Sequence, residues 1–79
     1  MLQFHKQTLE EERRLRAFVE AERSFSETAA SLSVKLHVSP RVARQVMDRY
    51  VQMHMVQRRT FEPRIEPIYY RNTLTAAAS

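Results

Sequence analysis

The chain has 79 residues, a net charge of +4, and neither cysteine nor glycine. A chain of this length forms one small domain with little room for an active-site cleft, and its composition, 43% hydrophobic and 28% charged, is that of a folded globular protein. The missing residue types exclude a disulfide framework, a thiolate metal site and a glycine-rich phosphate loop.

The basic charge is concentrated in the second part of the chain. Residues 1–27 carry five basic and six acidic side chains, whereas residues 28–79 carry eight basic and three acidic ones. Seven of those eight are arginine, whose guanidinium group makes bidentate contacts with phosphate and guanine that lysine cannot reproduce. A surface that binds a polyanion needs such a local excess of positive charge.

The sequence shows no segment for membrane insertion or export. No apolar run approaches the length of a membrane-spanning helix, and the N-terminal residues MLQFHKQTLEEE carry no signal-peptide core. We therefore expect a cytoplasmic protein that makes no contact with a membrane.

The first helix is expected to start near residue 9. Residues 1–7 have no clear hydrophobic period and are interpreted as a flexible N-terminal arm. Thr8 and Glu11 have capping-box spacing, so the helix is expected from about Leu9 to Glu22. Its inward face would comprise Leu15, Phe18, Val19 and the stem of Glu22, with Glu11, Arg14 and Arg16 outside or flanking.

A second, shorter helix is expected from about Glu27 to Leu36. Ser24 and Glu27 again have capping-box spacing, and Phe25 is placed to fill the core between two helices. The following turn, Leu36-His37-Val38-Ser39, has the length that joins the two helices of a helix-turn-helix. Such turns commonly contain glycine, and in this chain His37 occupies the position where we would expect that glycine.

The third helix, residues 39–53, has the clearest signals in the chain. Ser39 is a strong N-cap and Pro40 suits the first helical turn. Apolar residues recur at i, i+3, i+4 and i+7 and form a buried stripe: Ala43, Val46, Met47 and Tyr50. The opposite side holds Arg41, Arg44, Gln45, Asp48 and Arg49. Such a helix fits the DNA major groove, although a solvated amphipathic helix gives the same pattern.

Two strands are expected after the third helix. Residues 55–61 have weak strand character, residues 62–67 form a turn with two prolines, and Ile68-Tyr69-Tyr70-Arg71 is β-branched and aromatic. Tyr69 and Tyr70 would point to opposite faces, one of them onto the third helix.

Residues 73–79 are interpreted as a disordered tail. The methionines at the end of the third helix, Met47, Met53 and Met55, are interpreted as core residues.

Three helices followed by a two-stranded hairpin make an α+β fold that is mainly α. This order is that of a winged helix-turn-helix, with the hairpin as the wing, over residues 8–72.

The turn, the third helix and the first strand resemble a known family. The segments Leu36-His37-Val38-Ser39, Ala43-Arg44 and His54-Met55-Val56-Gln57-Arg58 resemble the small winged-helix regulators of bacterial fimbrial operons, over roughly residues 15 to 71. His37 and His54 depart from the family, since small residues or glycine are usual there, so we expect local backbone strain at His54. The resemblance implies a sequence-specific transcriptional regulator of a bacterium, plasmid or phage, acting alone or beside a larger DNA-binding protein.

The exposed side chains of a helix-turn-helix take two roles. The expected base contacts are Arg41, Arg44, Gln45 and Asp48, in which arginine favours guanine and glutamine favours adenine. Asp48 either contacts cytosine or orients Arg44 through an i, i+4 pair. The expected contacts of the DNA backbone or the wing are Lys35, Ser39, Arg49, Arg58, Arg59 and Arg64.

Other functions have less support in the sequence. His5, His37 and His54 lack metal-ligand spacing, and no serine has a base at nucleophile spacing, so we expect no metal, no cofactor and no enzymatic activity. The alternative is a winged-helix module that binds protein through Val34, Val42, Val51 and Ile65. The expected partner is double-stranded DNA at the nucleoid, and a homodimer would gain affinity by covering two half-sites.

Overall fold

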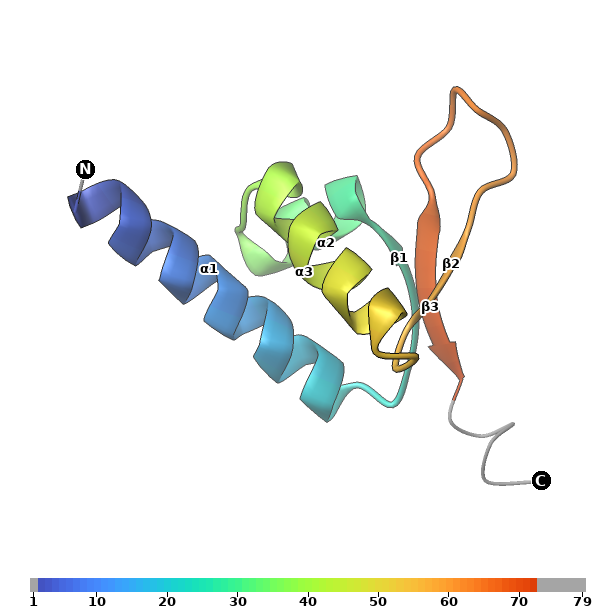
Figure 1. Ribbon diagram of the computed structural model, residues 1–79, viewed down its shortest axis with the longest axis horizontal. Coiled ribbons are helices and arrows are strands. Elements are labelled where there is room, and N and C mark those ends of the chain that lie inside the picture. The colour runs from blue at the N-terminus through green and yellow to red at the C-terminus, as the bar shows by residue number, and fades with distance from the viewer. Residues whose placement is uncertain (1, 73–79) are drawn as a thin grey trace.

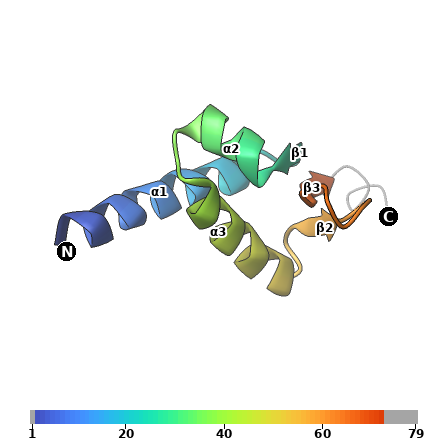
Figure 2. The same ribbon diagram turned by 90° about the horizontal axis from the view of Figure 1, so that it is seen from above.

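The computed structural model describes residues 2–72, which form three helices and three strands (Figure 1). In chain order these are α1 (Leu2–Ala21), β1 (Ser24–Thr28), α2 (Ala29–Leu36), α3 (Pro40–Gln52), β2 (Gln57–Arg59) and β3 (Ile68–Asn72). The helices lie to one side of an antiparallel sheet with the strand order β1-β3-β2 (Figures 1 and 2). The fold is therefore α+β and mainly helical, as predicted.

The order of the elements differs from the prediction, because β1 lies between the first two helices. The predicted capping box at Ser24 and Glu27 is wrong. Phe25 is half-buried and its ring centroid lies 5.1 Å from that of Phe18, while the two neighbouring serines are exposed. In residues 24–26 the side chains alternate between the two faces of the sheet, and the backbone pairs with β3. This strand pairing here outweighs the tendency of serine to cap a helix. The hairpin is thus part of a three-stranded sheet.

α2 is capped by Thr28 and begins at Ala29, two residues after its predicted first residue. The Thr28 hydroxyl accepts a hydrogen bond from the Ser31 N–H (3.0 Å), and the Ser31 hydroxyl accepts one from the Thr28 N–H (2.9 Å). Serine here takes the place of the glutamate or glutamine of the usual capping box. The predicted end at Leu36 is confirmed.

α1 begins at Leu2, so the predicted start at Leu9 is wrong (Figure 1). No proline or glycine interrupts residues 2–7, and the helix continues through them. Thr8 consequently lies inside the helix and does not cap it. The flexibility predicted for the N-terminal arm stays a prediction, and the predicted tail, residues 73–79, lies outside the described residues.

The turn between α2 and α3 depends on a left-handed residue. His37 has a φ of 57°, and its N–H donates to the Ser33 carbonyl at the end of α2. His54, just after α3, has a φ of 62°. The expectation that these histidines occupy glycine positions is therefore confirmed. The left-handed region costs about 1–2 kcal/mol for a residue with a Cβ.

We expect His37→Gly to raise the free energy of unfolding by about 0.5–1 kcal/mol, since glycine removes the left-handed penalty but adds entropy to the unfolded chain. His37→Ala is the matched control, because it keeps the Cβ atom and should give no such gain. Urea denaturation followed by circular dichroism measures both variants. A His37→Gly variant that is no more stable than the alanine variant would contradict this interpretation of the turn.

α3 has the predicted bounds, cap and buried stripe. The Ser39 hydroxyl accepts from the Val42 N–H (3.2 Å), and the stripe of Ala43, Val46, Met47 and Tyr50 is buried. The stripe packs in one core with Leu15 and Val19 of α1, Leu32 of α2 and Tyr69 of β3. Two of the methionines predicted to fill the core are instead exposed, Met53 by 54% and Met55 by 40%.

β2 and β3 form the predicted hairpin, although β2 is shorter than residues 55–61. Gln57 lies opposite Tyr70, and Arg59 lies opposite Ile68. Tyr69 is 1% exposed and Tyr70 is half-buried on the other face, as predicted. The loop of residues 60–67 projects from one end of the sheet (Figure 1).

None of the helices in residues 2–72 has both the length and the apolar composition of a membrane-spanning segment.

Candidate nucleic-acid interface

The predicted base-reading side chains lie together on the outer side of α3. Arg41, Arg44 and Gln45 are exposed, and Asp48 is half-buried one turn further along. The opposite side of α3 is buried against α1 and α2, so the helix cannot rotate without exposing its core stripe. This side of α3 therefore presents the guanidinium groups of Arg41 and Arg44 and the amide of Gln45 to solvent, the groups that form bidentate bonds with base edges.

The N-terminal end of α3 is held by Glu11, which was expected outside or flanking the inward face of the first helix and is instead buried. Glu11 is only 7% exposed, and its Oε1 accepts a hydrogen bond from the Ser39 N–H at 2.9 Å. A carboxylate is favoured at this position because unpaired N–H groups give a helix N-terminus partial positive charge. The signal was in the sequence, since Glu11, Leu15 and Val19 follow one another at four-residue spacing on one stripe of α1.

The C-terminal half of α3 is joined to the wing by a group that we call the Asp48 clamp: Asp48, Arg58 and Tyr69. Asp48 Oδ1 accepts hydrogen bonds from Arg58 Nη1 and from the Tyr69 hydroxyl, both at 2.8 Å. These three residues come from α3, β2 and β3, so the clamp fixes the position of the hairpin relative to the helix. The structure gives Asp48 these partners in place of Arg44.

The Asp48 clamp predicts a stability change at alkaline pH. Burial and the hydrogen bond to Asp48 raise the pKa of Tyr69 from 10.0 to about 12. Between these two values the unfolded chain loses this phenolic proton while the folded protein keeps it, so stability should fall as the pH rises. We expect a loss of about 2 kcal/mol from this residue between about pH 10 and about pH 12.

Tyr69→Phe is the variant that isolates this effect, because it removes the titrating hydroxyl and keeps the buried ring. Urea denaturation at several alkaline pH values should show a shallower loss of stability in the variant than in the wild type. Burial also raises the pKa of Tyr50, so a smaller decline remains in both proteins. Equal declines in the two proteins would contradict the assignment to Tyr69.

Two arginines of α3, Arg44 and Arg49, form loose ion pairs at the edges of the exposed side. Arg44 Nη2 lies 3.6 Å from Glu66 Oε1 at the base of the wing, and Arg49 Nη1 lies 3.9 Å from Glu12 Oε1 on α1. Both guanidinium side chains are more than half exposed. Exposed pairs of this kind are worth about 0–1 kcal/mol, so a phosphate or base competes with them at little cost.

The hairpin of β2 and β3 carries the other basic residues predicted to contact DNA. Arg58 is held by the Asp48 clamp, and Arg59 is exposed with its guanidinium carbon 5.7 Å from the centroid of the Phe61 ring. Arg64 is exposed in the loop of residues 60–67. These three cations are therefore spread along the hairpin from its strand to its loop.

Lys35 and Ser39, which were predicted to contact the DNA backbone, both have partners within the protein. The Lys35 ammonium group lies 2.6 Å from Glu27 Oε2 on β1 and 5.8 Å from the ring centroid of Phe18 on α1. The described partners of Lys35 are therefore on β1 and α1. Ser39 is half-buried and its hydroxyl caps α3.

The comparisons with known proteins give no relative. No family model, no curated protein and no solved structure matches the chain. In the part of the chain from residue 2 to residue 72, no group of three histidine, cysteine, aspartate or glutamate residues is placed to hold a metal ion. The geometry of α3 and the wing is therefore the basis for the functional inference.

Proposed function

We propose that the protein is a winged helix-turn-helix regulator of transcription that binds double-stranded DNA, with α3 in the major groove and the wing against the backbone or the minor groove. The observation that carries the proposal is the exposure of Arg41, Arg44 and Gln45 on one side of a helix anchored at both ends. An α-helix with its side chains is about 10–12 Å wide and the major groove about 12 Å, so the dimensions agree.

The sequence of elements also supports the proposal. The helices α2 and α3 are joined by a short turn, and the β2–β3 hairpin follows them in the chain. The hairpin is hydrogen-bonded to α3 through the Asp48 clamp. This arrangement is compatible with a winged helix. In this proposal Arg41, Arg44 and Gln45 read bases, while Asp48 positions Arg58 and makes no base contact itself.

The remaining arginines supply affinity that does not depend on sequence. Arg49, Arg58, Arg59 and Arg64 lie around the reading face and would neutralise phosphates.

The proposal includes a cytoplasmic, nucleoid-associated location and a bacterial, plasmid or phage origin. It also includes binding as a homodimer or beside a larger DNA-binding protein.

The direct test is fluorescence anisotropy with a labelled duplex of arbitrary sequence at several salt concentrations. Four phosphate contacts predict a slope of about −4 in a plot of log K against log salt concentration. A duplex selected from a random pool should bind more tightly than the arbitrary one, which would establish sequence specificity. An absence of binding at low salt would contradict the proposal.

The alternative function, a module that binds protein, has less support in the structure. Two of its four predicted contact residues are strongly exposed, Val34 by 78% and Ile65 by 52%. Val42, however, is buried in the core and Val51 is half-buried, so the expectation that all four are exposed is wrong. The exposed pair lies on two different elements, α2 and the loop of residues 60–67.

A further inference from the structure

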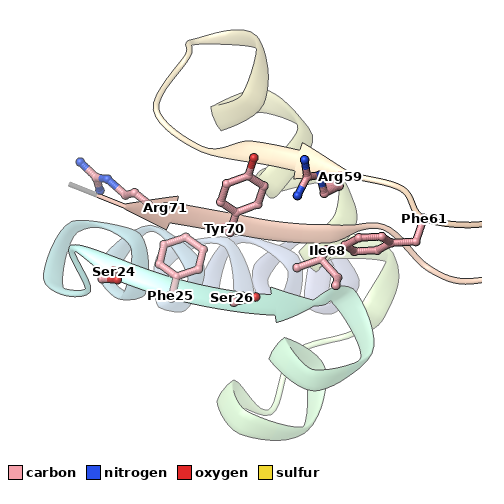
Figure 3. A pocket seen from close by; sticks show the side chains of 8 residues that line it. All are labelled: Ser24, Phe25, Ser26, Arg59, Phe61, Ile68, Tyr70 and Arg71. Carbon is pink, nitrogen blue, oxygen red and sulfur yellow. The ribbon is translucent and has the colours of Figure 1, made fainter. Parts of the chain in front are cut away.

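The outer face of the sheet carries a hollow that shares Arg59 with the proposed DNA-binding surface and lies otherwise outside it. It has a volume of about 460 Å³. Figure 3 shows the aromatic rings of Tyr70 and Phe61 and the side chain of Ile68 along it. The other lining residues of this hollow, which we call the sheet groove, are Ser24, Phe25, Ser26, Arg59 and Arg71. Phe25 and Arg71 belong to it only in part, because their side chains contact Phe18 and the Val19 carbonyl on α1.

The sheet groove combines aromatic and aliphatic side chains with positive charge. No aspartate or glutamate is among its lining residues within the described part of the chain. Arg71 Nη1 already donates to the Val19 carbonyl at 2.8 Å, whereas Arg59 is exposed and its described contact is the stacked ring of Phe61. Arg59 is consequently the cation best placed to take a new anionic partner.

We propose that the sheet groove binds a small planar aromatic carboxylate. The ring system would lie on Tyr70 and Ile68, and the carboxylate would accept hydrogen bonds from the Arg59 guanidinium group. Aromatic rings stack on such apolar surfaces, and arginine binds carboxylates through its two-pronged donor geometry. The volume lies at the lower end of the range of small-molecule sites, which suits one fused ring system.

A single-stranded nucleic acid fits the sheet groove less well. Such strands bind along a line of cations that follows successive phosphates, with bases stacked on aromatic residues. The groove offers aromatic rings but only two guanidinium groups, and that of Arg71 is tied to the backbone of α1. The charge therefore matches one carboxylate and not a phosphate chain.

The sheet groove lies at the base of the wing. Arg59 and Ile68 are opposite each other on β2 and β3, where the two strands meet the loop of residues 60–67, and Phe61 belongs to that loop. A ligand that contacts all three would restrict the wing. If the proposed function is correct, the ligand therefore alters DNA affinity, but ligand binding itself does not depend on that function.

The experiment is a titration of the ¹⁵N-labelled full chain with 2-naphthoate, followed by amide chemical shifts and without DNA. We expect the largest changes at Arg59, Phe61, Ile68 and Tyr70. The neutral analogue 2-naphthamide and the non-aromatic cyclohexanecarboxylate should each bind about tenfold more weakly, because one loses the charge-assisted bonds and the other the stacking.

Arg59→Gln tests the role assigned to the guanidinium group. We expect this variant to bind 2-naphthoate about tenfold more weakly. Arg13→Gln on α1 removes the same charge far from the sheet groove and should leave the affinity unchanged. The absence of shift changes at millimolar naphthoate, equal affinity for naphthamide, or a tighter complex with oligothymidylate would overturn the proposal. Loss of DNA binding by the wild type would leave these results unaffected.

Discussion

Replacing both Arg41 and Arg44 by alanine is expected to weaken binding to a selected duplex by about 100-fold. Each guanidinium group is exposed on α3, and one bidentate contact with a guanine edge is worth about 1–3 kcal/mol of discrimination. Affinity for arbitrary duplex should fall much less, because the contacts of the wing with phosphate remain. Fluorescence anisotropy with both duplexes measures the loss of affinity and the loss of specificity separately.

The control is a variant with the same loss of charge elsewhere. Arg13→Ala combined with Arg16→Ala removes two exposed arginines from α1 and leaves α3 intact. We expect it to change the affinity for either duplex by less than about threefold at moderate salt, since screening weakens charges that lie away from the DNA. If both double variants lost the same affinity, only net charge would matter and the reading role of α3 would be wrong.

Asp48→Ala is expected to lower the free energy of unfolding by about 2–3 kcal/mol. The Tyr69 hydroxyl is buried, and without Asp48 it has lost its acceptor, which costs about 1–3 kcal/mol in addition to the lost bond of Arg58. For a domain of 79 residues this is a large part of the total stability. Urea denaturation followed by circular dichroism measures the effect.

A double-mutant cycle shows whether the loss comes from the Asp48 clamp. In a Tyr69→Phe background no hydroxyl is left unpaired, so Asp48→Ala should cost clearly less than in the wild type. Glu62→Ala removes an exposed carboxylate from the wing loop and should be close to neutral. Equal costs of Asp48→Ala in the two backgrounds would show that Asp48 and Tyr69 are not coupled.

The elements that the sequence predicted well have strong local signals. The Ser39 cap, Pro40 and the apolar stripe define α3 without reference to the rest of the chain, and the structure confirms its bounds. Likewise, the positive φ of His37 follows from the position of the turn. Each of these features depends on residues within about one or two helical turns, which is the range over which a sequence pattern is informative.

The features that the sequence did not predict depend on distant residues. Phe25 lies in a strand because β1 pairs with β3, and the serines around it have strong capping tendencies that suggested a helix start. Glu11 and Ser39 are 28 positions apart, and Asp48 and Tyr69 are 21 apart. No local pattern gives such pairs. The exposure of Arg41, Arg44 and Gln45 could therefore be predicted from the sequence, whereas the contacts that hold α3 in place could not.

The most direct test of the central proposal is an amide chemical-shift map of the ¹⁵N-labelled full chain with the selected duplex. The proposed binding mode predicts the largest changes in residues 41–49 of α3 and residues 58–67 of the wing, with small changes along α1. Changes confined to α1 or to β1, or no change at all with saturating duplex at low salt, would contradict the assignment of α3 as the helix that reads DNA.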